Sequence, residues 1–321
     1  MSRIRVGNSS FVATRFWNIV CLPRGRCERN DAVPVEWMKR APFRPMTAQH
    51  GAPRKDFMPL TARYAAAQQV ALKAGELARD LFAKRDSLIV EHKGAQNFVS
   101  RADRAIEDFI ASKLAAAFPG DAFLGEESAA SFAGVPEHVW VVDPIDGTHN
   151  FLRGLRYYCV SIAYVELGRT EVGVVYDPEH HEMFHARRGE GAWRRHAGDQ
   201  RRIAVSDCKA LKDALVAIGH HDRFVEPRYL ALRHALMDAG AATRNLGAGA
   251  LQLAHVAAGR LDGFVELSLN AWDALAGLLL VEEAGGHVAP FPGPERWRDP
   301  APVLGCTRGI AGALESMVGA W

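Results

Sequence analysis

Residues 141–151, VVDPIDGTHNF, contain the pattern on which the fold and the chemistry of this chain depend. The paired valines, extended upstream in HVWVV, predict a buried strand. Asp143 and Asp146 follow, three residues apart around a proline, and Gly147 with Thr148 predicts a turn into a short helix. Because functional side chains collect in the loops at strand ends, this stretch predicts a site at the edge of a sheet.

Helical and strand patterns interleave on both sides of this stretch. Helices are expected at about residues 60–84, in NFVSRADRAIEDFIASKLAAAF, and at about 226–238, 248–258 and 272–284, with a last one in IAGALESMVG. Strands are expected in SLIVEH, FLGEES, CVSIAYVEL, EVGVVYDPEHHEMFHARRG, ALVAIG, DGFVEL and PVLGCT. No repeat or long linker separates these elements. The mixture predicts an α/β fold with helical layers packed on sheets.

Composition excludes several classes of protein. Of 39 Lys and Arg and 37 Asp and Glu, residues 1–57 hold 11 and 4, which leaves 28 against 33 for the rest and excludes the broad basic face of a nucleic-acid binder. The 5 cysteines are spread without a CxxC pair, so neither a disulfide framework nor a zinc knuckle is indicated. Since no apolar run of about 18 residues or convincing signal peptide is present, we expect a soluble, cytoplasmic protein.

The first 57 residues mix Arg, Pro and isolated aromatic residues without helical or strand periodicity. We expect residues 1–57 to be an unstructured extension, or a start assigned too far upstream with Met38, Met46 or Met58 as the true first residue. A targeting segment and a folded accessory element are the alternatives. Residues 58–321 are expected to form the catalytic domain.

Acidic residues cluster at predicted strand ends in three separated places: Glu126 with Glu127 in GEES, Asp143 with Asp146, and Asp273 at the start of a helix. Mg²⁺ requires oxygen ligands, usually a few carboxylates with water and substrate phosphate, and zinc is not favoured because no His or Cys belongs to the set. The ordinary interpretation of each place alone is a turn or a helix-start acid. The three together indicate a metal site.

A phosphate fits beside these acids. Gly147 lets the backbone approach a ligand, and the amides of Gly147 and Thr148 at a helix start present donors to an anion. An EF-hand is excluded because its acids must stand at alternate positions. Metal plus phosphate is the physical interpretation.

The segments GEES, WVVDPIDGTHNF and AWDALAGLLLVEEAGG, in this order and at these separations, closely resemble the inositol monophosphatase family of Mg²⁺-dependent, lithium-sensitive phosphatases. The resemblance runs from about Leu60 to the C-terminus. It implies a layered α-β-α-β-α sandwich of the sugar phosphatase type, usually a homodimer, that hydrolyses small phosphomonoesters by direct attack of a metal-activated water without a phosphoenzyme.

The resemblance also implies the metal ligands. Glu126, Asp143 and the carbonyl of Ile145 would bind the activating ion, and Asp143, Asp146 and Asp273 would bind a second one. A third, weaker ion completes the set in some members, so two or three Mg²⁺ ions are expected.

The remaining site residues follow from the same motifs. Gly147 and Thr148 would meet the phosphate and the nucleophilic water, Glu266 falls where the family contacts a substrate hydroxyl, and Lys93 matches a site lysine. One position departs from the family, which usually has aspartate where this sequence has Asn97. That aspartate helps to polarise Thr148 and the water, or completes the third metal site.

Asparagine keeps the shape and hydrogen bonding of aspartate but loses the charge. We expect Glu126 with Thr148 to activate the water and Mg²⁺-dependent activity to survive. The alternative is a phosphate-ligand binding or regulatory protein with weakened chemistry.

Other stretches of the chain resemble functional motifs only in part. HEMFH, residues 181–185, matches the zincin pattern, but it follows Pro178 in a hairpin-like pattern, and in a strand the two His Cα atoms lie roughly 13 Å apart. GAGALQ has Gln252 where a dinucleotide-binding loop has glycine, and Cys159 in an apolar strand is expected to be a core residue.

The substrate is the open question at this stage. Inositol monophosphate leads, followed by histidinol phosphate, a sugar bisphosphate and a phosphoadenosine nucleotide. No nucleic-acid or membrane partner is expected.

Overall fold

The computed structural model describes residues 59–84, 90–92, 98–129, 132, 134–220 and 227–319. The predictions made for residues 1–57, Lys93 and Asn97 lie outside this part of the chain. Within it, none of the helices is both long and apolar enough to cross a membrane.

A seven-stranded sheet contains residues 141–146, the VVDPID part of VVDPIDGTHNF. Its order is β3-β4-β5-β6-β7-β8-β9, with β3 parallel to β4 and every other pair antiparallel. The strands are β3 Ala122–Gly125, β4 His138–Asp146, β5 Cys159–Glu166, β6 Arg169–Asp177, β7 Glu182–Arg187, β8 Ala192–His196 and β9 Asp199–Arg202. Most of HEMFH lies in β7, as predicted, so its histidines do not share a helical face.

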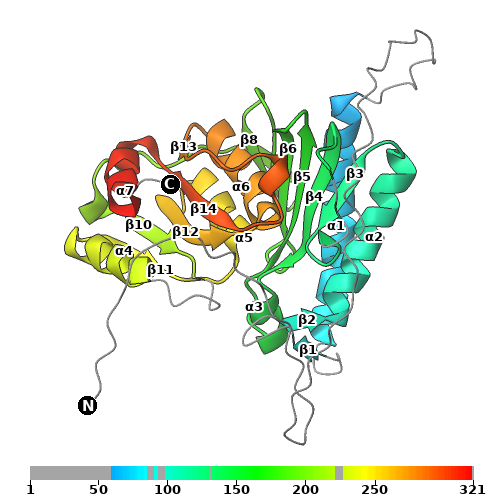
Figure 1. Ribbon diagram of the computed structural model, residues 1–321, viewed down its shortest axis with the longest axis horizontal. Helices are drawn as coiled ribbons and strands as arrows, with labels where there is room; N and C mark the ends of the chain where they lie inside the picture. The colour runs from blue at the N-terminus through cyan, green and yellow to red at the C-terminus, as the bar shows by residue number, and fades with distance from the viewer. Residues whose placement is uncertain are drawn as a thin grey trace, which may run out of the picture. The chain divides into compact units, whose positions relative to one another are not determined.

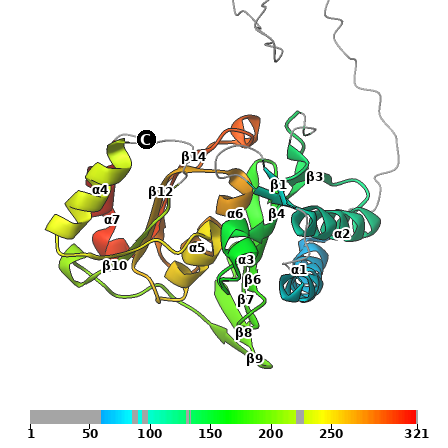
Figure 2. The same cartoon turned by 90° about the horizontal axis from the view of Figure 1, so that it is seen from below.

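Two helices cover one face of this sheet, α1 (Leu60–Ala83) and α2 (Arg101–Ala117) (Figures 1 and 2). Small side chains bring α1 close to the strands, because Ala67, Ala71, Ala74 and Ala78 are fully buried in one stripe. The short antiparallel ribbon of β1 (Val90–His92) and β2 (Phe98–Ser100) precedes α2. The sheet contributes a matching apolar face from β4, β5 and β6.

A second sheet has five strands in the order β11-β10-β12-β14-β13. Its strands are β10 Leu215–Ile218, β11 Ala242–Arg244, β12 Gly263–Leu269, β13 His287–Val288 and β14 Ala301–Cys306. Helices α4 (Pro227–Asp238) and α7 (Ala311–Val318) pack on one face of it. Three short 3-10 helices lie at Leu211–Asp213, Pro294–Arg296 and Arg308–Ile310.

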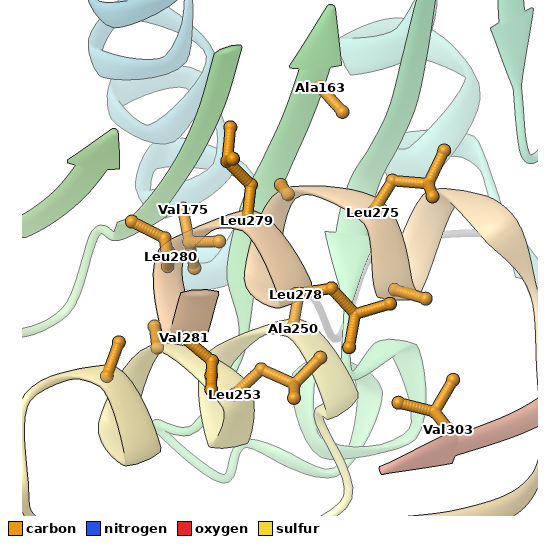
Figure 3. Close-up of a cluster of buried hydrophobic side chains, with 14 of the residues drawn as sticks. Ala163, Val175, Ala250, Leu253, Leu275, Leu278, Leu279, Leu280, Val281 and Val303 are labelled. Carbon is orange, nitrogen blue, oxygen red and sulfur yellow. The ribbon is translucent and has the colours of Figure 1, made fainter. Parts of the chain in front are cut away.

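Helices α5 (Gly249–Ala257) and α6 (Ala271–Glu283) fill the space between the two sheets (Figure 2). Almost every side chain of both helices is buried, which explains why their sequences are apolar all round. Figure 3 shows Leu279 and Leu280 of α6 directed toward the seven-stranded sheet and Val281 close to Leu253 of α5. The layers are therefore helix, sheet, helix, sheet, helix, which confirms the predicted fold class.

Candidate metal centre

The end of β4 departs from regular strand geometry at DPID. Asp143 lies opposite Ser161 and Asp146 opposite Cys159, so β4 contains one residue more than β5 between these pairs. Side chains three residues apart in a regular strand point to opposite faces, and a bulge resets the alternation. Pro144, which has no N–H to donate, occupies the irregular segment. The bulge is what allows both aspartates to face the same site.

Asp143, Asp146 and Asp273 form a cluster in which one carboxylate oxygen from each lies within 4.8 Å of the others. Asp273 comes from the first turn of α6, where its Oδ2 accepts the Asn270 backbone N–H at 3.3 Å in a capping box. Asp143 is fixed by its own turn, because Oδ1 accepts the Ile145 N–H at 2.8 Å. Two of the three acidic places predicted from the sequence thus meet directly.

Asp146 is held by the N-terminus of α5. Its Oδ1 accepts the Gly249 N–H at 3.0 Å, and Oδ2 accepts the N–H groups of Ala250 at 2.8 Å and Leu251 at 3.3 Å. The Cys159 thiol donates to Oδ2 at 3.4 Å. Each carboxylate oxygen has more than one lone pair, so a hydrogen-bonded aspartate can still ligate a cation. These contacts fix the direction of its remaining lone pairs.

Glu126 follows β3 and continues its pairing with β4, since its N–H donates to the Val142 carbonyl at 3.2 Å. Burial and then the negative charge of Asp273 raise the pKa of its carboxylate well above the usual value. Further repulsion comes from Asp103 and Asp146. The third predicted acidic place is therefore within electrostatic reach of the aspartates, and its binding of a metal stays a prediction.

The same physics acts on the aspartates. Burial raises the pKa of Asp143 well above its usual value, and the charges of Glu126 and Asp273 raise it further. Burial and Asp273 raise the pKa of Asp146 to about 7, against the opposing effect of the α5 amides. Burial and mutual repulsion therefore both disfavour the charged forms of these carboxylates.

The turn after β4 requires glycine. Gly147 has φ +98°, and a Cβ there would lie 3.0 Å from the Tyr157 carbonyl oxygen and 3.1 Å from the Ala248 Cβ. It precedes the short helix α3 (Thr148–Arg153), which confirms the predicted turn into a helix. The Thr148 hydroxyl donates to the Ile145 carbonyl at 3.0 Å, so Thr148 directly contacts the carbonyl that was predicted to bind a metal.

Glu266 lies on β12 with only 7% of its surface exposed. Burial raises its pKa well above the usual value, with smaller contributions from the charges of Asp273 and Asp146. The strand β10 ends against it, because a Cβ on Gly219 would lie 1.8 Å from Glu266 Oε2. The five-stranded sheet therefore brings one carboxylate to the same centre.

These residues fit a hard divalent cation. Every donor in the cluster is a carboxylate or carbonyl oxygen, and the buried acids repel one another unless a cation or protons neutralise them. Glu126, Asp143, Asp146, Asp273 and the Ile145 carbonyl are the groups that would hold such ions. The predicted Lys93 and Asn97 are outside the described residues.

Sequence reasoning missed two buried acids of α2. Asp103 and Glu107 have 1% and 4% of their surfaces exposed. The sequence did contain an indication of their burial, because their spacing places both acids on the same face of α2 as Ile106 and Ile110. Acids on such an apolar face are not expected to be solvated. Cys159 is a core residue as predicted, but its contact with Asp146 had no signal in the sequence.

Known proteins share this architecture. Residues 60–317 match the inositol monophosphatase family. An inositol-1-monophosphatase of Mesorhizobium japonicum is 41% identical over 254 residues, covering 77% of this chain and 92% of that protein. The Nus factor SuhB of Pseudomonas aeruginosa is 42% identical over 234 residues, covering 71% and 84%.

A solved structure agrees with the sequence relatives. The crystal structure of the extragenic suppressor protein suhB from Bartonella henselae superposes with a TM-score of 0.72 at 35% identity, covering 80% of this chain and 98% of that one. Sequence, fold and the arrangement of acids point the same way. The chain is an enzyme of a phosphatase family and belongs to the inositol monophosphatase family.

Proposed function

We propose that this protein is a Mg²⁺-dependent, lithium-sensitive phosphomonoesterase that hydrolyses a small polyol phosphate, with inositol monophosphate as the leading substrate. The observation that carries the proposal is the convergence of Asp143 and Asp146 of β4 with Asp273 of α6 to within 4.8 Å, with the charges of Asp273 and Asp146 acting on Glu126 as well. We further propose that it acts in the cytoplasm and forms a homodimer, the assembly that the family resemblance implies.

Each residue has a role that follows from its surroundings. Glu126, the three aspartates and the Ile145 carbonyl hold two or three Mg²⁺ ions, which when bound lower the pKa of water and neutralise charge on phosphate oxygens. The amides of Gly147 and Thr148 receive the phosphate at the start of α3. Thr148, with its proton directed to the Ile145 carbonyl, keeps a lone pair free to orient the attacking water, and Glu126 takes up the proton of that water.

The substrate's alcohol is recognised on the opposite side of the centre. Glu266 is fixed against Gly219 of the second sheet, and a buried carboxylate there accepts a hydrogen bond from a hydroxyl of the leaving group. A polyol fits this role because it retains hydroxyls beside the ester. Histidinol phosphate, a sugar bisphosphate and a phosphoadenosine nucleotide are the alternatives.

Phosphate release from a panel of these four substrate classes, with and without Mg²⁺ and Li⁺, tests the proposal. We expect Mg²⁺-dependent release, greatest for inositol monophosphate and reduced by Li⁺. Asp143→Asn is expected to abolish release, whereas Asp199→Asn, an exposed acid on β9, is the matched control and should leave it unchanged. No release from any member of the panel by the wild-type enzyme would refute the proposal.

A second candidate function rests on one residue. Asn97 stands where the family has aspartate, so the protein could bind a phosphate ligand with weakened chemistry. Asn97→Asp measured beside wild type separates the two functions. A large gain from near zero would favour the binding protein, and a small change from substantial wild-type turnover favours the enzyme.

A further inference from the structure

Behind Glu126 lies a second buried carboxylate that no role in the proposed chemistry uses. Glu107, on the inward face of α2, has 4% of its surface exposed. Its Oε2 accepts the backbone N–H of Glu127 at 2.8 Å, and the backbone N–H of Ser128 adds a second hydrogen bond. A helix side chain thus satisfies the backbone of the turn that follows β3.

The contact between Glu107 and this turn is close on both sides. A Cβ on Gly125 would lie 2.3 Å from both Cδ and Oε2 of Glu107, so the carboxylate rests directly against the backbone of Gly125. On its other side the turn is bound to β4 through the Glu126 N–H and the Val142 carbonyl. The residue between these two attachments is Glu126, which the proposed function assigns to metal binding.

The hydrogen bond from the Glu127 N–H to Glu107 satisfies a backbone donor of the turn. A buried N–H without an acceptor is unfavourable, so loss of the Glu107 carboxylate favours a rotation of the turn that returns its N–H groups to water. Such a rotation also moves Glu126. Arg104 of α2 also contacts the turn through an ion pair with Glu127 at 3.4 Å, in which the Arg104 side chain is half exposed.

We propose that Glu107 is a positioning residue of the metal centre, which through the backbone of residues 125–128 holds the Glu126 carboxylate in the direction of the three aspartates. The inference rests on the proposed function, since it assigns Glu126 to metal binding. It predicts that Glu107 acts on metal affinity, whereas a residue that serves stability alone would change only the melting temperature.

Equilibrium binding of Mn²⁺ to the full chain, followed by electron paramagnetic resonance, measures the effect without an assay of activity. Glu107→Ala is expected to weaken binding about 10- to 100-fold, the range for residues that orient metal ligands. Glu107→Gln, which keeps one oxygen acceptor, is expected to fall between this variant and wild type. Asp108→Asn is the matched control, because Asp108 is the next residue of α2 and is exposed.

Gly125→Ala gives an independent test in which Glu107 is retained. The new Cβ displaces the carboxylate, so this variant alone is expected to weaken Mn²⁺ binding by a factor similar to that of Glu107→Ala. Added to Glu107→Ala, it is expected to have little further effect, because the atoms with which it collides are gone. Additive losses in affinity would contradict the positioning role.

The outcomes separate this inference from the proposed function. If wild type binds Mn²⁺, Asp143→Asn does not, and folded Glu107→Ala binds as tightly as wild type, Glu107 has no positioning role and the metal centre stands. If wild type itself binds no Mn²⁺, the proposed function fails and the inference fails with it. Melting curves of every variant establish that the protein is folded.

Discussion

At the level of single residues, Pro144 and the bulge around it determine that the side chains of Asp143 and Asp146 point to the same site. In a regular strand Asp143 and Asp146 would lie on opposite faces, and one of them would enter the apolar core. The extra residue turns both toward Asp273, and the N-terminus of α5 then fixes Asp146. The site depends on a local irregularity rather than on the periodicity of the strand.

The buried acids predict a pH dependence of stabilisation by metal. The pKa of Asp146 is raised from 3.8 to about 7 in the metal-free fold, so the folded state binds more protons than the unfolded state between these values. The metal-free protein therefore loses stability as pH rises through this window, and bound Mg²⁺ offsets the loss. We expect the increase in Tm caused by saturating Mg²⁺ to grow from about pH 5 to about pH 8.

Differential scanning calorimetry with and without Mg²⁺ measures this increase. Buried His185 and partly buried His255, whose pKa values are lowered by desolvation to about 4, affect the scans with and without Mg²⁺ equally and cancel in the difference. An increase in Tm that is independent of pH would show that the acid cluster does not bind the ion.

Gly147 allows a prediction with a matched control. Gly147→Ala places a side chain at φ +98° and brings its Cβ to 3.0 Å from the Tyr157 carbonyl, whereas Gly198→Ala at φ +83° meets nothing within 4 Å. Both variants are expected to lose about 1–2 kcal/mol of unfolding free energy from the left-handed backbone. Only Gly147→Ala should also lose phosphate release, by at least tenfold.

Urea unfolding and phosphate release, measured on both variants, check this expectation. Equal loss of activity in the two variants would mean that backbone strain alone, and not the close approach at Gly147, controls turnover.

At the level of elements, the close packing of α5 on α6 ties two parts of the site together. Gly277 of α6 leaves room for α5, since a Cβ there would lie 2.5 Å from the Leu253 Cβ. Gly277→Ala is expected to lower the free energy of unfolding by about 1–3 kcal/mol, because the new Cβ overpacks the contact between the helices. It is also expected to weaken Mg²⁺ binding, because the N-terminus of α5 binds Asp146 and α6 contains Asp273.

The control for this substitution is Gly312→Ala on α7, where an added Cβ meets nothing within 4 Å. Alanine is the better helix former by about 1 kcal/mol, so this variant should be as stable as wild type or more so, with unchanged metal binding. Chemical denaturation and Mg²⁺ titration compare the two. Unchanged metal affinity in a destabilised Gly277→Ala would show that α5 and α6 position the acids independently.

The elements differ in how well the sequence predicts them. Helix α1 was expected at about residues 60–84 and is found at Leu60–Ala83, because its apolar positions recur at helical spacing. Strand β9 was not expected, since all of its side chains are exposed and DQRR shows no apolar alternation. The short strands β11 and β13 were missed because pairing with longer neighbours forms them, not a pattern of their own.

The candidate site shows the same division. The three acidic places were predicted from residue type and position at strand ends, and the structure brings two of them together and leaves the third within electrostatic reach. The sequence could not predict the hydrogen bonds that Glu107 accepts from the turn or those that Asp146 accepts from α5. Both depend on how closely a helix approaches the end of a strand. Sequence patterns indicate which face is buried but not that distance.

At the scale of the whole molecule, the family match covers residues 60–317 and does not include the first 57 residues. We predict that a chain of residues 58–321 has the same Tm and the same rate of phosphate release as the full chain. Calorimetry and the phosphate assay on the two proteins check this. A large drop in Tm or in activity on truncation would assign residues 1–57 a part in the fold or the site.

The assembly of the centre from distant segments has a consequence for how the chain unfolds. Glu126 and Asp273 stand about 150 residues apart in the sequence, so an ion bound by both would close a long loop as a cross-link does. When the ion leaves, the chain between the two residues regains the conformational freedom that closing the loop had cost. Such a link acts on the rate of opening as well as on the equilibrium. The ions of this enzyme would then govern its lifetime against proteases as much as its turnover.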